Sequence, residues 1–137
     1  MSDDTLEERS ARKVEVTKVE ESLVASEKYT QIFHEKNFQF NAPHRFLIFS
    51  SKENGAPENL LATINFQYGP VAEQGVNGVT NENLLNLVKI RLEGFQNSDF
   101  KCRENAIALT HIEEALLWLS YRTSKREARG VEGTHKV

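Results

Sequence analysis

The sequence predicts an α+β fold in which a small antiparallel β-sheet is followed by a long C-terminal α-helical hairpin. Of its 12 aromatic residues, 8 lie between positions 29 and 68, where apolar and polar residues alternate as they do in strands. From position 80 onward, the apolar residues recur at helical spacing instead. A length of 137 residues fits one domain, so we expect a polar extension over residues 1–28 and a single domain over residues 29–137.

The extension over residues 1–28 contains few apolar positions among many charged ones. Val16, Val19 and Leu23 fall at helical spacing, which gives a helix only weak support. A segment that can bury so little is typically frayed or disordered, so we expect residues 1–28 to be disordered or helical.

The β region should cover residues 29–79. Phe38 and Phe40 alternate with a polar residue, residues 45–49 (RFLIF) form a short apolar run, and residues 64–68 (INFQY) alternate again. A glycine and a proline in residues 50–58 indicate a turn longer than a two-residue hairpin. We therefore expect two or three antiparallel strands with one face buried.

The helical hairpin should cover residues 80–129 and be followed by a tail over residues 130–137. Thr80 is a suitable N-cap for a first helix that ends near position 95. A second helix should run from about position 103 to 129, where Gly130 ends it. At about 1.5 Å per residue this helix is roughly 40 Å long and should overhang its partner. An overhanging amphipathic helix usually packs against another protomer.

The composition excludes several classes of protein. The longest apolar runs fall far short of the roughly 20 residues of a membrane-spanning helix, and the acidic start does not resemble a signal peptide. The single cysteine, Cys102, excludes an intrachain disulfide framework. A net charge of −3 argues against binding to DNA or RNA polymers. These features predict a soluble protein of the cytoplasm.

The charge is unevenly distributed, and residues 101–137 carry 7 basic against 5 acidic residues. Within the second helix, Arg122 and Arg126 lie one turn apart at the edge of the apolar stripe, on a flank of small residues. They could extend past the helix end into solvent or pair with carboxylates such as Glu127. Alternatively they could form an anion clamp, because two guanidinium groups one turn apart match the oxygens of a diphosphate.

Asn105 lies on broadly the same face as the two arginines, but 17 residues before Arg122. That spacing corresponds to roughly 25 Å of helix, so one small ligand cannot contact both ends of a single helix. Two such helices packed antiparallel about a two-fold axis would bring the start of one beside the end of the other. The geometry therefore suggests a pocket shared between protomers.

Residues able to support catalysis or metal binding are poorly placed in this sequence. Cys102 and His111 lie on opposite sides of the second helix, and the histidines lack metal-ligand spacing. Trp118 and Tyr121 could stack on a base, although aromatic residues at such positions more often pack against protein. We expect neither a catalytic residue nor a metal site, and hence no enzymatic activity and no cofactor.

Four segments together resemble one protein family. They are residues 64–78 (INFQYGPVAEQGVNG), 91–96 (RLEGFQ), 100–109 (FKCRENAIAL) and 121–134 (YRTSKREARGVEGT). In this order they are similar to the first type of phage-encoded Thoeris anti-defence sponge, whose helical hairpin is shared with the anti-CBASS cyclic-oligonucleotide sponges. The resemblance covers about residues 60–135.

The resemblance implies a function that composition alone does not indicate. Such proteins sequester, without cleaving it, the glycocyclic ADP-ribose isomer made by a TIR-domain enzyme, in the cytoplasm of the infected bacterial host. Some members also bind cyclic di- or trinucleotides, and they assemble as dimers or as hexamers built from three dimers. By motif, Phe95 would stack on the adenine, Asn105 would hydrogen-bond the ligand, and Arg122 and Arg126 would hold its phosphates.

Three other functions remain open at this point. An enzyme that degrades the signal is disfavoured by the lack of a suitable base or metal cluster. An interaction module could block a host protein through the strands or the extension, without binding a small molecule. A helix-turn-helix DNA-binding protein fits least well, because the net charge is negative and the second helix is long.

Overall fold

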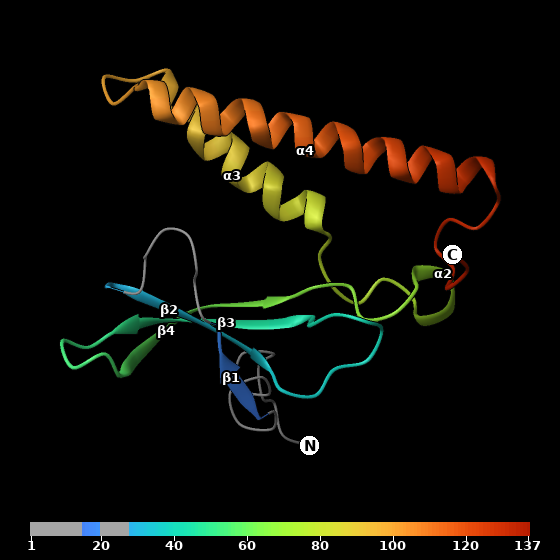
Figure 1. Ribbon diagram of the computed structural model, residues 1–137, viewed down its shortest axis with the longest axis horizontal. Helices are drawn as coiled ribbons and strands as arrows, with labels where there is room; N and C mark the ends of the chain where they lie inside the picture. The colour runs from blue at the N-terminus through green and yellow to red at the C-terminus, as the bar shows by residue number, and fades with distance from the viewer. Residues whose placement is uncertain (1–14, 20–27) are drawn as a thin grey trace. The chain divides into compact units, whose positions relative to one another are not determined.

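A computed structural model describes residues 15–19 and 28–137 and confirms the α+β fold class (Figure 1). The chain divides into two compact units, residues 1–69 and 70–137, which are treated separately below. The first unit contains the sheet, and the second contains the helical hairpin. None of the helices among the described residues is long and apolar enough to cross a bilayer.

The first unit is a four-stranded antiparallel sheet with the strand order β1-β2-β3-β4. Its strands are β1 (Val16–Lys18), β2 (Thr30–Glu35), β3 (Arg45–Ser51) and β4 (Pro57–Asn65). β3 lies between β2 and β4, so its apolar run has a neighbouring strand on each side. Leu47 of β3 is the buried hydrophobic residue among those described, with 3% of its surface exposed.

Three buried polar side chains, Gln31, Glu35 and His44, hold the ends of these strands. The two carboxylate oxygens of Glu35 accept hydrogen bonds from the backbone N–H groups of His44 and Arg45, each at 2.9 Å. Gln31 donates to the Ser51 hydroxyl at 2.9 Å and to the carbonyl oxygen of Gly55. Buried polar groups that are paired in this way avoid the cost of desolvation without a partner, so the sheet is stabilised where its turns begin.

The structure corrects three expectations for this unit. Residues 38–40 do not form a strand, because the chain turns there; Phe40 has a φ of 56°. The strand count is four, because residues 16–18 of the predicted extension pair with β2 instead of forming a helix or remaining disordered. The expectation for residues 1–14 and 20–27 lies outside the described residues. The strand β4 begins at Pro57, inside the stretch expected to be a turn.

The second unit contains α2 (Val71–Gln74), α3 (Asn81–Gln96) and α4 (Arg103–Ala128). Thr80 caps α3 as expected: its hydroxyl accepts from the N–H of Asn83, whose side chain accepts from the N–H of Thr80. Gly130 follows α4 with a φ of 72°, a conformation that favours glycine at a helix end. The one-turn helix α2 was not expected, because it is only four residues long and lies between the turn-forming residues Pro70 and Gly75.

Helices α3 and α4 form the predicted hairpin, in which α4 runs alongside α3 and continues beyond it (Figure 1). With 26 residues against 16, α4 is about 39 Å long and α3 about 24 Å, which confirms the overhang. No side chain of either helix is buried. The overhanging part of α4 carries the arginines predicted to bind an anion.

Candidate functional site

The four predicted site residues lie in two pairs at opposite ends of α4. Phe95 is in the last turn of α3 and Asn105 in the first turn of α4, on either side of the hairpin link. Arg122 and Arg126 lie near the other end of α4. Asn105 and Arg126 are 21 positions apart, or about 32 Å of helix. One chain therefore brings each pair together but does not bring the two pairs together.

The link between the helices is braced by side-chain hydrogen bonds. The amide of Gln96 donates to the Cys102 carbonyl oxygen at 3.1 Å and accepts from the Cys102 N–H at 3.0 Å. The hydroxyl of Ser98 donates to the Phe95 carbonyl oxygen at 2.7 Å. The guanidinium of Arg91 lies over the half-buried Phe95 ring, 5.1 Å from its centroid. These contacts fix the backbone around Phe95 and place a cation against one face of its ring.

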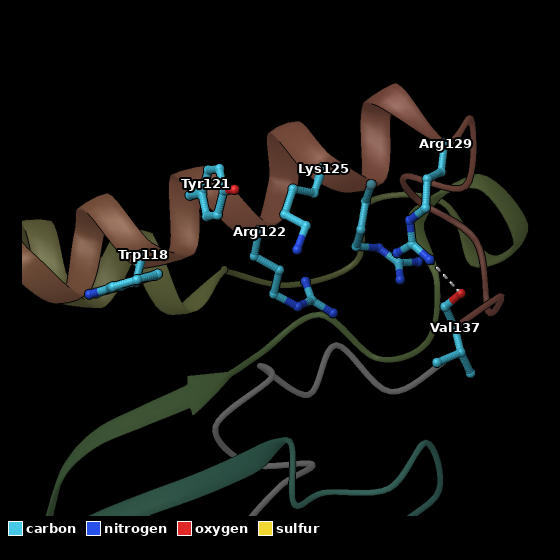
Figure 2. Close-up of a pocket in the computed structure, with 7 residues that line it drawn as sticks. Trp118, Tyr121, Arg122, Lys125, Arg129 and Val137 are labelled. Carbon is cyan, nitrogen blue, oxygen red and sulfur yellow. Dashed lines mark hydrogen bonds between the residues drawn. The ribbon is translucent and has the colours of Figure 1, made fainter.

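A basic pocket of about 400 Å³ opens at the other end of α4. It is lined by Trp118, Tyr121, Arg122, Lys125, Arg126, Arg129 and Val137. We call this the basic pocket. Figure 2 shows Arg122 and Arg129 projecting from the same side of α4. Four cationic side chains and two aromatic rings in one concave surface are suited to a phosphorylated ligand that carries an aromatic base.

The cations of the basic pocket are held differently from one another. One terminal nitrogen of Arg126, Nη2, donates to the carbonyl oxygens of Val131 and Thr134, each at 3.0 Å, while Arg122 is exposed. Arg129 donates from Nη1 to the Val137 carbonyl oxygen at 3.0 Å, as the dashed line in Figure 2 shows. The ammonium of Lys125 lies 5.5 Å from the centroid of the Tyr121 ring.

Pairing with a carboxylate does not account for the two predicted arginines. Among residues 15–19 and 28–137, ion pairs join Lys89 to Glu93, His111 to Glu114 and His135 to Glu73, and neither arginine takes part. Their charges are therefore not neutralised by a carboxylate of the described chain. Of the two alternatives to an anion clamp, pairing with a carboxylate such as Glu127 is not observed. Arg122 still projects toward solvent, as the other alternative allows.

Sequence reasoning placed Lys125 and Arg129 at the helix end but did not assign them to a pocket. The sequence spacing could have assigned them, because positions 118, 122, 125 and 129 repeat at three- and four-residue intervals and therefore share one face of α4. Trp118 and Tyr121 were considered for stacking, and both line the basic pocket. The contacts from Val131 and Thr134 to Arg126 had no such signal, because they come from an irregular segment.

Metal ligation has no support within the described part of the chain. No group of three or more histidine, cysteine, aspartate or glutamate residues there is arranged to hold an ion. Two ionisable groups are shifted by a neighbour: the hydrogen bond that Lys89 donates to Glu93 raises the pKa of Lys89, and the hydrogen bond from His135 lowers the pKa of Glu73. Neither group lines the basic pocket.

Comparison with known proteins gives two matches. Residues 58–124 match the family described as Acb2/Tad1, hairpin domain. The protein Thoeris anti-defense 1 from Bacillus phage SBSphiJ7 is 46% identical to this chain, and the match covers 80% of this chain and 92% of that protein. The chain belongs to this Thoeris anti-defence family. The resemblance inferred from the four sequence segments is confirmed, and the chain is placed among phage anti-defence proteins.

The match to the hairpin domain of the Thoeris anti-defence family includes three of the four predicted site residues. Phe95, Asn105 and Arg122 lie within residues 58–124, whereas Arg126 lies just beyond them. The matched region also begins inside the sheet unit, at the start of β4. The ligand-binding roles of the four residues stay predictions.

Proposed function

We propose that this protein is an anti-defence sponge that binds, and does not cleave, the cyclic ADP-ribose isomer of Thoeris immunity. The observation that carries the proposal is the basic pocket, in which four cationic side chains and two aromatic rings surround about 400 Å³. A cyclic ADP-ribose carries a diphosphate and an adenine. Fixed guanidinium groups and ring faces are the partners that such a ligand requires.

The proposed ligand pocket is shared between two protomers. The Phe95–Asn105 end and the Arg122–Arg126 end of one hairpin are separated by about 25–32 Å of helix, more than a dinucleotide-sized ligand can bridge within one chain. An antiparallel pair of hairpins would place the stacking ring and amide of one chain against the arginines of its partner. The unburied apolar side chains of α3 and α4 supply a surface for this pairing.

Sequestration rather than cleavage is consistent with the groups that line the basic pocket. Its charged members are arginines and a lysine, and its lining contains neither a carboxylate nor a histidine side chain to act as a general base. Arginine stays protonated at all relevant pH values and therefore stabilises charge without transferring a proton. A sponge needs tight binding and slow release, which preorganised cations favour.

Calorimetric titration with the cyclic ADP-ribose isomer tests the proposal, followed by acid quench and chromatography of the ligand. We expect the ligand to be recovered unchanged. Recovery of altered ligand would show that the protein is an enzyme. Cyclic di- and trinucleotides are titrated in parallel, because binding of these ligands is a separate prediction of the family resemblance. A protein that binds none of these ligands but captures a host protein would be an interaction module.

Arg122→Ala and Arg126→Ala should each weaken binding by about 1.5–3 kcal/mol, the range for a hydrogen bond to a charged group. That range corresponds to roughly a 10- to 150-fold increase in Kd. Lys52→Ala, which removes an exposed cation from the turn between β3 and β4, is the charge-matched control and should not change Kd. Wild-type affinity in both arginine variants would refute the clamp.

Mixing two inactive variants tests whether the pocket is shared. One chain carries Phe95→Ala with Asn105→Ala, and the other carries Arg122→Ala with Arg126→Ala. If the two ends meet across a dimer, each mixed dimer has one pocket built entirely from unmutated ends. Co-expressed chains should then recover binding in about a quarter of all pockets. No recovery in verified mixed dimers would place the ligand within a single protomer.

A further inference from the structure

The chain that follows α4 turns back on that helix. The backbone N–H of Val131 donates to the Arg126 carbonyl oxygen at 3.1 Å. Both the N–H and the hydroxyl of Thr134 donate to the Val131 carbonyl oxygen, at 3.1 and 2.6 Å. We call residues 130–134 the return turn. Its carbonyl groups at positions 131 and 134 both face the Arg126 guanidinium.

The return turn occupies one terminal nitrogen of the Arg126 guanidinium. Nη2 donates to Val131 and to Thr134, each at 3.0 Å, so both of its N–H bonds are occupied. An arginine has five N–H donors, and the three on Nη1 and Nε are outside these two bonds. A guanidinium is planar and rigid, so fixing Nη2 also fixes the directions of the remaining donors. Arg122 lies in the same pocket but is exposed.

The return turn is itself anchored to the one-turn helix α2. The backbone N–H of Ala72 donates to the Gly133 carbonyl oxygen at 2.8 Å, and His135 pairs with the Glu73 carboxylate. Gly133 has a φ of 76°, in the left-handed region that β-branched residues avoid. A Cβ at Gly133 would meet Ala72 at 3.6 Å, an ordinary contact distance. The backbone conformation at position 133, rather than lack of space, therefore favours glycine.

We propose that α2 and the return turn position the Arg126 guanidinium for anion binding, with Gly133 as a positioning residue that does not contact the ligand. The proposal deepens the proposed function and rests on it. Two carbonyl groups hold the side chain before a ligand arrives, so less side-chain freedom is lost on binding. The same contacts fix the directions of the N–H groups on Nη1 and Nε, which determines where an anion in the basic pocket can accept a hydrogen bond from Arg126.

The test compares Gly133→Val with Gly133→Asn and with Gly55→Val. Valine disfavours the left-handed conformation, whereas asparagine tolerates it, so asparagine should rescue the turn. Gly55 lies in the sheet unit and has a φ of 86°. A Cβ added at this position would have no other atom within 4 Å. Gly55→Val therefore imposes similar backbone strain away from Arg126. Thr134→Val, which removes the 2.6 Å hydroxyl bond and keeps the side-chain shape, is a second, milder variant.

Two measurements are made on the full chain. The first is exchange between the Nη1 and Nη2 NMR signals of Arg126 in the free protein, which rotation about the Cζ–Nε bond causes and the hydrogen bonds to Nη2 slow. These signals are assigned from Arg126→Ala. We expect faster exchange in Gly133→Val and Thr134→Val, and wild-type exchange in Gly133→Asn and Gly55→Val. The second is calorimetric Kd for the cyclic ADP-ribose isomer, which should rise about 5- to 10-fold in Gly133→Val and return to the wild-type value in Gly133→Asn.

Unchanged Arg126 exchange in both Gly133→Val and Thr134→Val would overturn the proposal. So would an equal rise of Kd in Gly133→Val and Gly55→Val, which would reflect general strain. If Gly133→Val fails to fold, as judged by circular dichroism, Thr134→Val decides the question. If the wild type does not bind the ligand, the proposed function fails, and the exchange data still show whether the return turn holds Arg126.

Discussion

The sheet unit and the hairpin unit bury their side chains to different extents. In the sheet unit, Leu47 is 3% exposed and lies in the same sheet as three buried polar side chains that are hydrogen-bonded within the unit. In the hairpin unit, no side chain of α3 or α4 is buried. Large apolar residues are instead exposed there, including Leu87, Ile90, Leu117 and Trp118.

This difference shows where each unit obtains its stability. The buried side chains of Gln31, Glu35 and His44 are all hydrogen-bonded within the sheet unit, as a structure stable within one chain requires. The hairpin has local helix signals, and its apolar surface is left exposed within a single chain. The predicted binding residues lie on the hairpin, so ligand binding and association with a second copy should be linked.

The largest expected effect is in the sheet unit. Leu47→Ala should lower the free energy of unfolding by about 2–5 kcal/mol, because it removes a buried side chain and leaves a cavity. Leu61→Ala, at a position of β4 that is 57% exposed, is the matched control and should change it by less than about 0.5 kcal/mol. Chemical denaturation measures both. Equal changes in the free energy of unfolding would contradict the difference in burial between Leu47 and Leu61.

The hairpin unit should become more stable as the protein concentration rises. Trp118 is the single tryptophan of the chain and lies on α4, so its fluorescence reports on the hairpin. If a second copy covers this unit, a tenfold rise in concentration adds about 1.4 kcal/mol to its apparent stability. Hydrogen exchange at the Leu47 amide reports on the sheet in the same samples. A Trp118 melting midpoint independent of concentration would show that the hairpin is stable without a partner.

Thr80→Ala should destabilise the hairpin unit by about 1 kcal/mol, because the hydroxyl caps α3 by accepting from the Asn83 N–H. Thr110→Ala is the matched control in the interior of α4, where alanine is the better helix former. Trp118 fluorescence during thermal unfolding measures both variants. No loss of stability in Thr80→Ala relative to Thr110→Ala would show that the cap of α3 does not stabilise the hairpin unit.

The smallest expected effect is a pH dependence of the return turn. The hydrogen bond from His135 lowers the pKa of Glu73 below its usual value of about 4.5, so folding favours the ionised carboxylate. This contribution is complete above pH 4.5 and is lost as the pH falls through the lowered pKa. NMR shifts of the Ala72 amide, followed from pH 6 to pH 3, should move in the wild type. The Ala72 shifts should change less in Glu73→Gln. An equal change in both proteins would show that Glu73 does not cause the pH dependence.

Helix ends were predictable because the residues that determine them are close in sequence. Thr80 caps α3 through Asn83, three positions away, and Gly130 ends α4 through its own backbone conformation. The observed helices therefore differ from the predicted ones by only one residue at most ends. The overhang of α4 followed directly from the two helix lengths.

Strand positions were less predictable, because strands depend on distant partners. The alternation at Phe38 and Phe40 indicated a strand, yet the buried Glu35 carboxylate binds the N–H groups of His44 and Arg45 and draws this segment into a turn. Val16 and Thr17 favour a strand, but a run of three residues is too short to predict one, and residues 16–18 become β1 by pairing with β2. Neither outcome can be read from a short stretch of sequence.

The candidate site also has features that follow from local sequence and features that depend on distant parts of the chain. Helical spacing and the family resemblance selected Phe95, Asn105, Arg122 and Arg126, and spacing alone could have added Lys125 and Arg129. The hydrogen bonds that hold Arg126 could not be anticipated, because they come from carbonyl groups, which every residue has.

The sequence by itself determined the fold class, the two long helices, the identity of the basic residues on α4 and the family. Each of these depends on side-chain type and local spacing. Only the tertiary structure decided the strand register, the one-turn helix α2 and the orientation of Arg126 by the return turn. Those features depend on backbone groups that meet across tens of residues, as when Ala72 meets Gly133, and backbone groups carry no signature in the sequence.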